Sequence, residues 1–71
     1  ALEFAVKEAS EVTGVPLAQL ELKSNLLIAC INRNGKVKIP RGQDMIGLGD
    51  TVIVVTTIKG LNDLRDILKN R

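Results

Sequence analysis

Histidine, tryptophan and tyrosine are absent from this chain of 71 residues, which has a single cysteine, Cys30, and a single phenylalanine, Phe4. Without histidine or tyrosine the chain lacks common acid–base groups, and one cysteine can neither close an internal disulfide nor supply a zinc site. Cys30 lies inside the apolar run LLIACI with no histidine to activate it, so we expect a buried structural cysteine. These absences predict that the chain is not an enzyme and leave binding and dimerisation as candidate functions.

Long apolar runs and phosphate-binding glycine motifs are also missing. No run approaches the roughly 20 apolar residues that cross a bilayer, and the opening ALEFAVKE does not fit a signal peptide, so we expect a soluble domain. A lone cysteine is typical of the cytoplasm. The glycines at positions 35, 42, 47 and 49 match neither the dinucleotide fingerprint nor the P-loop, so the sequence predicts no cofactor in this chain.

Charge of one sign is not concentrated in the sequence, because ten cations and eight acids give a net charge of +2 and are well mixed. Nucleic-acid binders usually gather lysine and arginine on one face and often stack bases on aromatic rings. We therefore predict no nucleic-acid partner, and a basic nucleic-acid-binding module is the weakest interpretation of this sequence.

The length predicts one domain, residues 1–71. A chain this short buries only about 60% of the surface that its unfolded form exposes. Small domains of this kind often rely on a disulfide, a metal or a partner, and the first two are not predicted here. We therefore expect a homodimer.

A hairpin is the clearest structural pattern. Leu26 to Ile31 is a short apolar run with the length of a buried strand, and Asn34-Gly35 is a strong turn signal because both residues tolerate positive φ. Val37 and Ile39 then alternate with lysines, which predicts a strand with one buried face. Pro40 ends this strand.

A loop and a second apolar strand follow. Thr51 to Ile58 is β-branched at almost every position, and its continuous apolar centre predicts burial on both faces. Gly49-Asp50 indicates a turn before this strand. Three apolar side chains are expected to pin the loop from 42 to 50 to the core: Met45, Ile46 and Leu48.

The two ends of the chain carry weaker patterns. Residues 1–12 fit a strand and a helix about equally, and Gly14-Val15-Pro16 ends whichever forms. Pro16 then suits the first turn of a short helix, PLAQLEL, with Leu17 and Leu20 on one face. Leu61 to Lys69 predicts an amphipathic helix, whose apolar stripe is Leu61, Leu64, Ile67 and Leu68. The fold class expected is α+β, with a small, largely antiparallel four-stranded sheet, a short helix and a C-terminal amphipathic helix.

The stretch LLIACINRNGKVKIPRGQDMIGLGDTVIVV resembles the TrkA C-terminal domain, also called the RCK C-terminal domain. That family has an apolar strand ending in isoleucine and arginine, a glycine turn, a strand ending Ile-Pro-x-Gly, a loop, then Gly-Asp and a valine-rich strand. The matching residues here are Ile31 with Arg33, Gly35, Ile39 to Gly42, Gly49-Asp50 and Val52 to Val55. Asn32, between isoleucine and arginine, is one departure. The upstream TGVPLAQLEL is also similar, so the resemblance covers nearly the whole chain and implies an initial strand with Leu2, Phe4 and Val6 facing inward.

The resemblance also implies a function. Such domains are cytoplasmic regulatory parts of potassium uptake systems, held at the inner face of the membrane through a potassium channel or transporter subunit. They follow an N-terminal nucleotide-binding domain that takes NAD or ATP and that is not in this chain. They pair as dimers, and in several members the dimer cleft binds cyclic di-AMP. The alternatives are a purely structural dimerisation module and a regulatory domain of another cation transporter or antiporter.

The segment around IPRG supplies candidate ligand-binding residues. Backbone amides after a proline, beside several cations, suit a phosphate or an adenine edge, and neighbouring apolar side chains could flank a base. Two copies across a two-fold axis would converge on a symmetric dinucleotide. The candidates are Arg33, Lys38, Ile39, Pro40 and Arg41.

A purely structural interpretation of the same segment is the stronger of the two. Pro40 ends a strand, Gly42 supplies a backbone geometry that other residues resist, and Arg41 points to water. We predict no metal site, because Asp44 and Asp50 are too few carboxylates for a cation.

Overall fold

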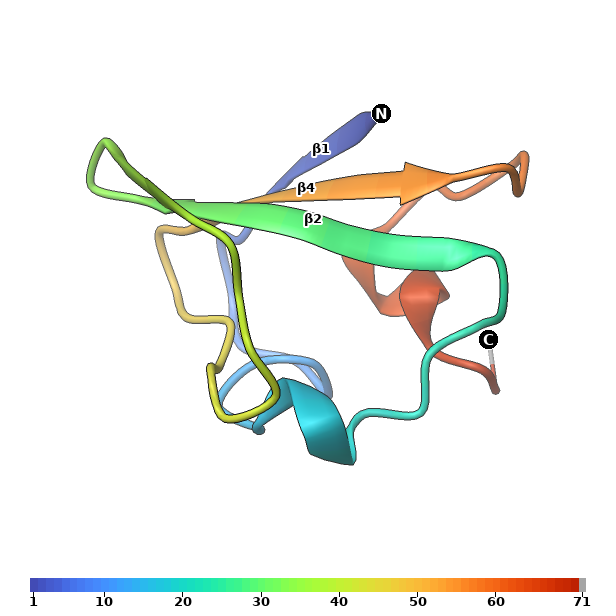
Figure 1. Cartoon of the computed structure of the whole chain (residues 1–71), viewed down its shortest axis with the longest axis horizontal. Coiled ribbons are helices and arrows are strands. Elements are labelled where there is room, and N and C mark those ends of the chain that lie inside the picture. The colour runs from blue at the N-terminus through green and yellow to red at the C-terminus, as the bar shows by residue number, and fades with distance from the viewer. Residues whose placement is uncertain (71) are drawn as a thin grey trace.

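The computed structural model describes residues 1–70 and contains one four-stranded sheet with two single-turn 3₁₀ helices. The elements in chain order are β1 (Leu2–Ala5), η1 (Leu17–Gln19), β2 (Leu26–Arg33), β3 (Lys36–Lys38), β4 (Thr51–Thr56) and η2 (Leu64–Ile67). The strand order is β1-β4-β2-β3, and all three pairings are antiparallel, which confirms the predicted sheet. Figure 1 shows the sheet along one side and both 3₁₀ helices and the long connections on the other.

The core lies between the inner face of the sheet and these connections. Val52 and Val54 of β4 are fully buried, and Ile28 and Ile31 of β2 lie beside them in the ladder. The facing layer supplies the other buried apolar residues: Val6, Val12, Ile46, Leu64 and Ile67. No helix in residues 1–70 is long and apolar enough to span a membrane.

A β-bulge in β2 sets which side chains face inward. The ladder pairs Ile28 with Val54 and Cys30 with Ile53, so Ala29 is an extra residue. Because of it, the inward positions jump from Ile28 to Ile31 instead of continuing at every second residue. Arg33, two residues after Ile31, therefore also lies on the inner face.

The Asn34-Gly35 turn forms as predicted, but the strand after it is more exposed than expected. Asn34 and Gly35 have φ values of 55° and 82°, as a tight hairpin turn requires. Val37 and Ile39 were predicted to be buried and are 64% and 80% exposed. That prediction is wrong because β3 is a three-residue edge strand, and Val37 shares the outer face of the sheet with Asn32.

Strand β4 is buried on one face only, which corrects the expectation of burial on both. Its valines at 52 and 54 are inaccessible, whereas Val55 on the outer face is 48% exposed. Leu27, which pairs with Val55, is 63% exposed, and Cys30 on the same face is only partly buried rather than buried as predicted. No segment of residues 1–70 covers this apolar face, as the edge-on view shows (Figure 1).

The predicted amphipathic helix from Leu61 to Lys69 is wrong, since only Leu64–Ile67 forms a 3₁₀ turn. The Asp63 side chain caps this turn, and Leu64 and Ile67 are buried three residues apart, the period of a 3₁₀ helix. Leu68 is already extended and pairs with Leu22. The chain leaves the helical conformation here because the backbone at 67–69 bonds to residues 21–23.

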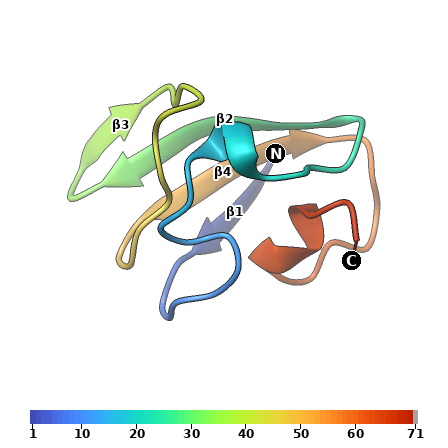
Figure 2. The ribbon, with the colours of Figure 1, turned by 90° about the horizontal axis from the view of Figure 1, so that it is seen from below.

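The N-terminal third contains the strand that the resemblance implies and a shorter helix than predicted. Residues 2–5 form a strand, as the resemblance implies, and the register sets Leu2 and Phe4 opposite the buried Val54 and Val52, on the inner face as predicted. Val6 is buried and Phe4 packs against the core, while Leu2 is 37% exposed on the edge strand. The expected helix PLAQLEL shrinks to Leu17–Gln19, and Pro16 precedes it in an extended conformation. Leu17 and Leu20 do both pack against the core. Figure 2 shows η1 and the C-terminal segment lying across this side of the sheet.

Candidate functional site

A pocket of about 450 Å³ lies between the β2–β3 hairpin and the segment 39–50 that leads to β4. Arg33 and Lys36 pair across the hairpin ladder, as do Ile31 and Lys38, so all four side chains lie on one face. The lining residues are Ile31, Arg33, Asn34, Lys36, Lys38, Asp44 and Met45. The pocket therefore has three cations, one acid and an apolar part.

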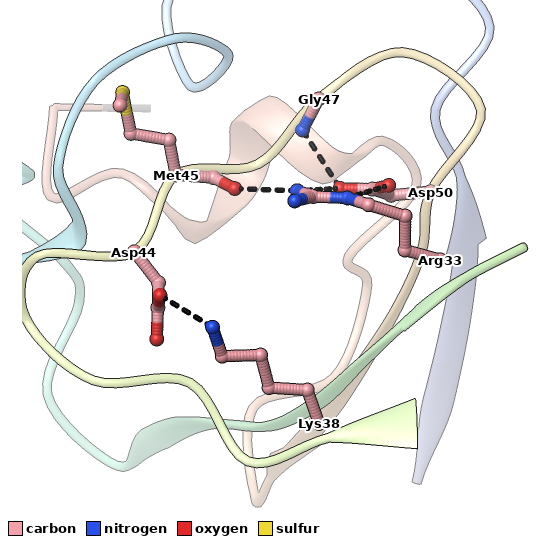
Figure 3. Close-up of polar contacts among 6 residues, drawn as sticks. All are labelled: Arg33, Lys38, Asp44, Met45, Gly47 and Asp50. Atoms are coloured by element: carbon pink, nitrogen blue, oxygen red, sulfur yellow. Dashed lines mark hydrogen bonds and ion pairs between the residues drawn. The ribbon is translucent and has the colours of Figure 1, made fainter. Parts of the chain in front are cut away.

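Arg33 is held by Asp50 at one wall of this pocket. Its Nε and Nη2 donate to the two carboxylate oxygens of Asp50 at 2.9 and 2.8 Å, and Nη2 also donates to the Met45 carbonyl at 2.9 Å (Figure 3). The Asp50 side chain is 1% exposed, while that of Arg33 is 56% exposed. The hydrogen bonds from Arg33, and a third from the Gly47 N–H, hold the pKa of Asp50 below its ordinary value although burial opposes this. Gly49-Asp50 was expected to form a turn. In the structure Asp50 of this turn is also the buried ion-pair partner of Arg33, which was predicted to bind a ligand.

Asp44, two residues after IPRG, bonds to Lys38 just before that motif and to Arg41 within it. One of its carboxylate oxygens accepts from the Lys38 ammonium at 2.8 Å, and the other accepts from the backbone N–H of Arg41 at 2.6 Å. The hydrogen bond from Lys38 is the main reason that the pKa of Asp44 is lowered, followed by that from Arg41. In Figure 3, Lys38 and Asp44 point toward one another from β3 and from the facing segment.

Backbone hydrogen bonds and one buried side chain fix the segment that carries Asp44. The N–H groups of Gly14, Leu17 and Ala18 donate to the carbonyls of Ile46, Asp44 and Gly42, each at 2.9 Å. Ile46 is fully buried, as predicted for the loop, whereas the prediction that Met45 and Leu48 also pin it is wrong because they are 46% and 62% exposed.

Gly42 is required for space and not for an unusual φ, which corrects the structural interpretation of IPRG. Its φ is not positive, unlike that of Gly14, Gly35, Gly49 and Gly60. A Cβ at position 42 would lie 3.0 Å from the Cβ of Ala18, tighter than ordinary van der Waals contact. The glycine of IPRG therefore packs directly against η1.

The structure brings together only part of the predicted ligand site. Arg33 and Lys38 line the pocket, whereas Ile39, Pro40 and the Arg41 side chain do not. Ile39 is 80% exposed, Pro40 is partly buried, and Arg41 reaches the site only through its backbone N–H. The role of all five residues in binding stays a prediction.

Sequence reasoning missed Lys36, Asn34, Ile31 and Met45 as pocket residues. Lys36 could have been found, because strand alternation places it on the face of Lys38. Met45 could not, because its position depends on the long-range bridge between Met45 and Pro16. Among residues 1–70, no three His, Cys, Asp or Glu side chains are grouped as a metal site would need.

Acidification should destabilise the domain. Folding lowers the pKa of Asp50 through Arg33, of Asp44 through Lys38 and of Asp66 through the backbone N–H groups of Asn62 and Asp63, from an ordinary value of 3.8. A carboxyl group with a lower pKa in the folded state contributes stability above its unfolded pKa, and this stability is lost as the pH falls through the folded pKa. We expect the urea midpoint to be flat from about pH 7 to 5 and to fall below about pH 4. Below about pH 4 the urea midpoint should fall less steeply with pH in Asp50→Asn than in the unmodified chain, and Glu3→Gln, an exposed control, should behave like the unmodified chain. If the midpoint falls equally steeply with pH in all three proteins, the loss of stability does not come from Asp50.

Residues 1–69 match the family described as the TrkA-C domain. The chain is 38% identical over 66 residues to a Trk system potassium uptake protein TrkA homolog of Archaeoglobus fulgidus, which covers 93% of this chain and 15% of that protein. It is 32% identical over 71 residues to a protein of the same name from Pyrococcus abyssi, covering 99% of this chain and 31% of that protein. Trk system potassium uptake protein TrkA homolog 2 of Methanosarcina mazei is 29% identical over 69 residues, 97% of this chain and 15% of that protein. The chain thus spans less than a third of the length of these relatives.

Proposed function

Because this chain belongs to the TrkA-C domain family, we propose that it is a regulatory domain of a potassium uptake system that senses a small anionic ligand. The names of its relatives support the first part, and the pocket beside Arg33, Lys36 and Lys38 supports the second. The relatives are several times longer than this chain, which supports a role as one part of a larger protein. That protein would include a nucleotide-binding domain for NAD or ATP and would act in the cytoplasm on a membrane transporter subunit.

The chemistry of the pocket favours a ligand that joins phosphate to an apolar or aromatic body. Lys36 has no ion-pair partner within residues 1–70, so its charge is available to an anion. Ile31 and Met45 supply apolar surface at the same place, where a base could lie. Cyclic di-AMP combines two phosphates with two adenines, so one half of it has the chemistry that this pocket suits.

A second copy of the chain would complete the site. Ile39, Met45 and Leu48 are exposed apolar residues in the segment that flanks the pocket. In a two-fold pair these residues would be covered and two pockets would face one ligand, so that a symmetric dinucleotide would contact both copies alike. The ligand would regulate the transporter only by binding one arrangement of the pair more tightly than another.

The uncovered outer face of the sheet supports a second candidate function, a purely structural dimerisation module. Leu27 and Val55 pair there and are 63% and 48% exposed, in a face that no segment of residues 1–70 covers. Contiguous exposed apolar surface of this kind often marks a protein interface. A pair formed through this face would leave the pocket open and without a regulatory role.

Calorimetry with cyclic di-AMP tests the proposal, with sedimentation to follow the oligomer. We expect one ligand per two chains, and we expect Lys36→Ala to weaken binding about tenfold or more, the effect of losing one charged hydrogen bond. Lys59→Ala, which removes the same charge from an exposed position after β4, is the matched control and should bind normally. Arg41→Ala tests the separate prediction for that side chain.

The competing function gives a different result in the same experiment. An intact dimer that releases no heat with cyclic di-AMP, and that Leu27→Lys dissociates while Ile39→Asp does not, would favour the structural module. Binding that is equal in Lys36→Ala and in the unmodified chain would place the ligand outside this pocket.

A further inference from the structure

The carboxylate of Asp44 lies where the ligand-binding interpretation of the sequence places a phosphate. The IPRG pattern indicates an anion held by Lys38 and by a backbone amide after Pro40. In the structure these two donors are taken by the chain's own Asp44, whose oxygens accept from Lys38 Nζ at 2.8 Å and from Arg41 N at 2.6 Å. The first distance is typical of a charge-assisted hydrogen bond, and the second is slightly shorter.

Asp44 is also the one acid that lines the pocket within residues 1–70. Its backbone is fixed, because its carbonyl accepts from the Leu17 N–H and its own N–H donates to the Arg41 carbonyl. The Asp44 side chain is 18% exposed and its carboxylate is held by the hydrogen bonds from Lys38 and the Arg41 N–H, whereas Lys38 is 61% exposed and free to follow a new anion. Rotation of the Asp44 side chain would free Lys38 Nζ and the Arg41 N–H without moving the backbone of segment 39–50.

An incoming phosphate would meet the charge of Asp44 at the same two donors. Like charges in contact are unfavourable, so the phosphate and the carboxylate cannot both use Lys38 and the Arg41 amide. The ligand must displace Asp44, and the hydrogen bonds lost by Asp44 are subtracted from those that the ligand gains. A bare anion gains little from this exchange, while a ligand that also covers Ile31 and Met45 gains apolar contact in addition.

We propose that Asp44 is an internal competitor that closes the anion site of the free domain and weakens the binding of every phosphate ligand, so that bare phosphate ions, which gain no apolar contact, do not fill the site. This inference rests on the proposed function, because it concerns the same pocket. Displacement of Asp44 would also break the Lys38–Asp44 link between the β2–β3 hairpin and the segment 39–50. Ligand binding would therefore loosen the hairpin at Lys38, while Arg33 still bonds to Asp50 and to the Met45 carbonyl, which is a local conformational change with a defined cause.

Anion titrations of Asp44→Asn and Asp44→Ala against the unmodified chain test this inference. The probes are inorganic pyrophosphate, which lacks an apolar part, and cyclic di-AMP. We expect both variants to bind pyrophosphate about tenfold more tightly, the factor for one charged contact, and to bind cyclic di-AMP more tightly by a similar factor, because either probe must displace Asp44 in the unmodified chain. Glu8→Gln removes the same charge from an exposed position outside the pocket and should change either affinity less than about twofold.

A readout that needs no ligand accompanies the titration. The Arg41 amide is bonded to Asp44, so its hydrogen exchange should accelerate in Asp44→Ala while the amides of Val52 and Val54 stay protected. The protected β4 amides also show that the variant is folded, so a failure to bind could not be attributed to unfolding.

The outcomes separate this inference from the proposed function. If cyclic di-AMP binds the unmodified chain and both Asp44 variants equally, the ligand proposal stands and the competitor role is wrong. If pyrophosphate binding rises in the variants but cyclic di-AMP binds none of the proteins, the competitor role stands and the proposed ligand is wrong. No binding of either probe to any of the proteins overturns both.

Discussion

Replacing Asp50 with asparagine is expected to lower the free energy of unfolding by about 2–3 kcal/mol, the effect of losing charged hydrogen bonds at a buried site. The Asp50 side chain is 1% exposed and accepts from Arg33 Nε, Arg33 Nη2 and the Gly47 N–H. Asparagine fits the same space but has one acceptor oxygen, so its amide N–H₂ must face another donor. In a domain of this size the change corresponds to a fall in Tm of about 10–20 °C.

Thermal and urea unfolding followed by circular dichroism measure this effect. Glu3→Gln, which neutralises an exposed carboxylate on β1, is the matched control and should shift Tm by only a few degrees. Arg33→Lys keeps the charge but loses the two-pronged contact, so its Tm should lie between those of the unmodified chain and Asp50→Asn. A Tm for Asp50→Asn within the range of the control would show that Arg33 and Asp50 are not a structural pair.

This pair bears directly on the predicted ligand site. Arg33 was predicted from sequence to bind a ligand, and its guanidinium lines the pocket while two of its nitrogens face Asp50. Asp50 in turn accepts the Val6 N–H through its carbonyl, and the Gly49 N–H donates to the Val6 carbonyl. A ligand that reorients Arg33 would therefore disturb Asp50 and, through it, the backbone hydrogen bonds that join the Gly49-Asp50 turn to Val6.

Local chemistry made the central hairpin predictable. Asn34-Gly35 tolerates the positive φ values that the turn has, an apolar run forms β2, and a β-branched run forms β4. Each of these features depends on residues that are close in sequence. The order Gly49-Asp50 before an apolar run likewise placed the turn before β4.

The errors arose where distant segments decide the structure. The apolar stripe from Leu61 to Leu68 fits a helix, but backbone bonding of residues 67–69 to residues 21–23 keeps the chain extended after one turn. The bulge at Ala29 depends on the register with β4 and leaves no signal in the sequence. Val37 and Val55 look like core residues because alternation does not show whether a second layer covers a face.

Only the local part of the candidate site was predictable, because contacts between distant segments decide the rest. The lysines of β3 share a face by strand alternation, which the sequence shows. The partners of the cations do not follow from local pattern, since Arg33 and Asp50 are 17 residues apart. Asp44 lies only six residues from Lys38, but its role depends on the fixed path of the segment between Pro40 and β4.

Ile46→Ala is expected to lower the free energy of unfolding by about 2–4 kcal/mol, as for other fully buried aliphatic side chains. Ile46 is inaccessible to solvent although it lies in a connection between strands. Its carbonyl accepts the Gly14 N–H, and it bridges to Thr13, so the surrounding backbone is fixed and cannot collapse readily into a cavity. Urea unfolding should show a lower midpoint with an unchanged slope.

Leu48→Ala is the matched control, because Leu48 lies in the same segment and is 62% exposed, so its loss should be within about 0.5 kcal/mol. The same comparison reports on the site, since Ile46 anchors the segment that holds Asp44 against Lys38 and the Arg41 amide. Below the unfolding midpoint, hydrogen exchange at Arg41 should accelerate in Ile46→Ala and not in Leu48→Ala. Equal losses of stability in the two variants would mean that burial of Ile46 does not fix this segment, and the closed position of Asp44 would then need another cause.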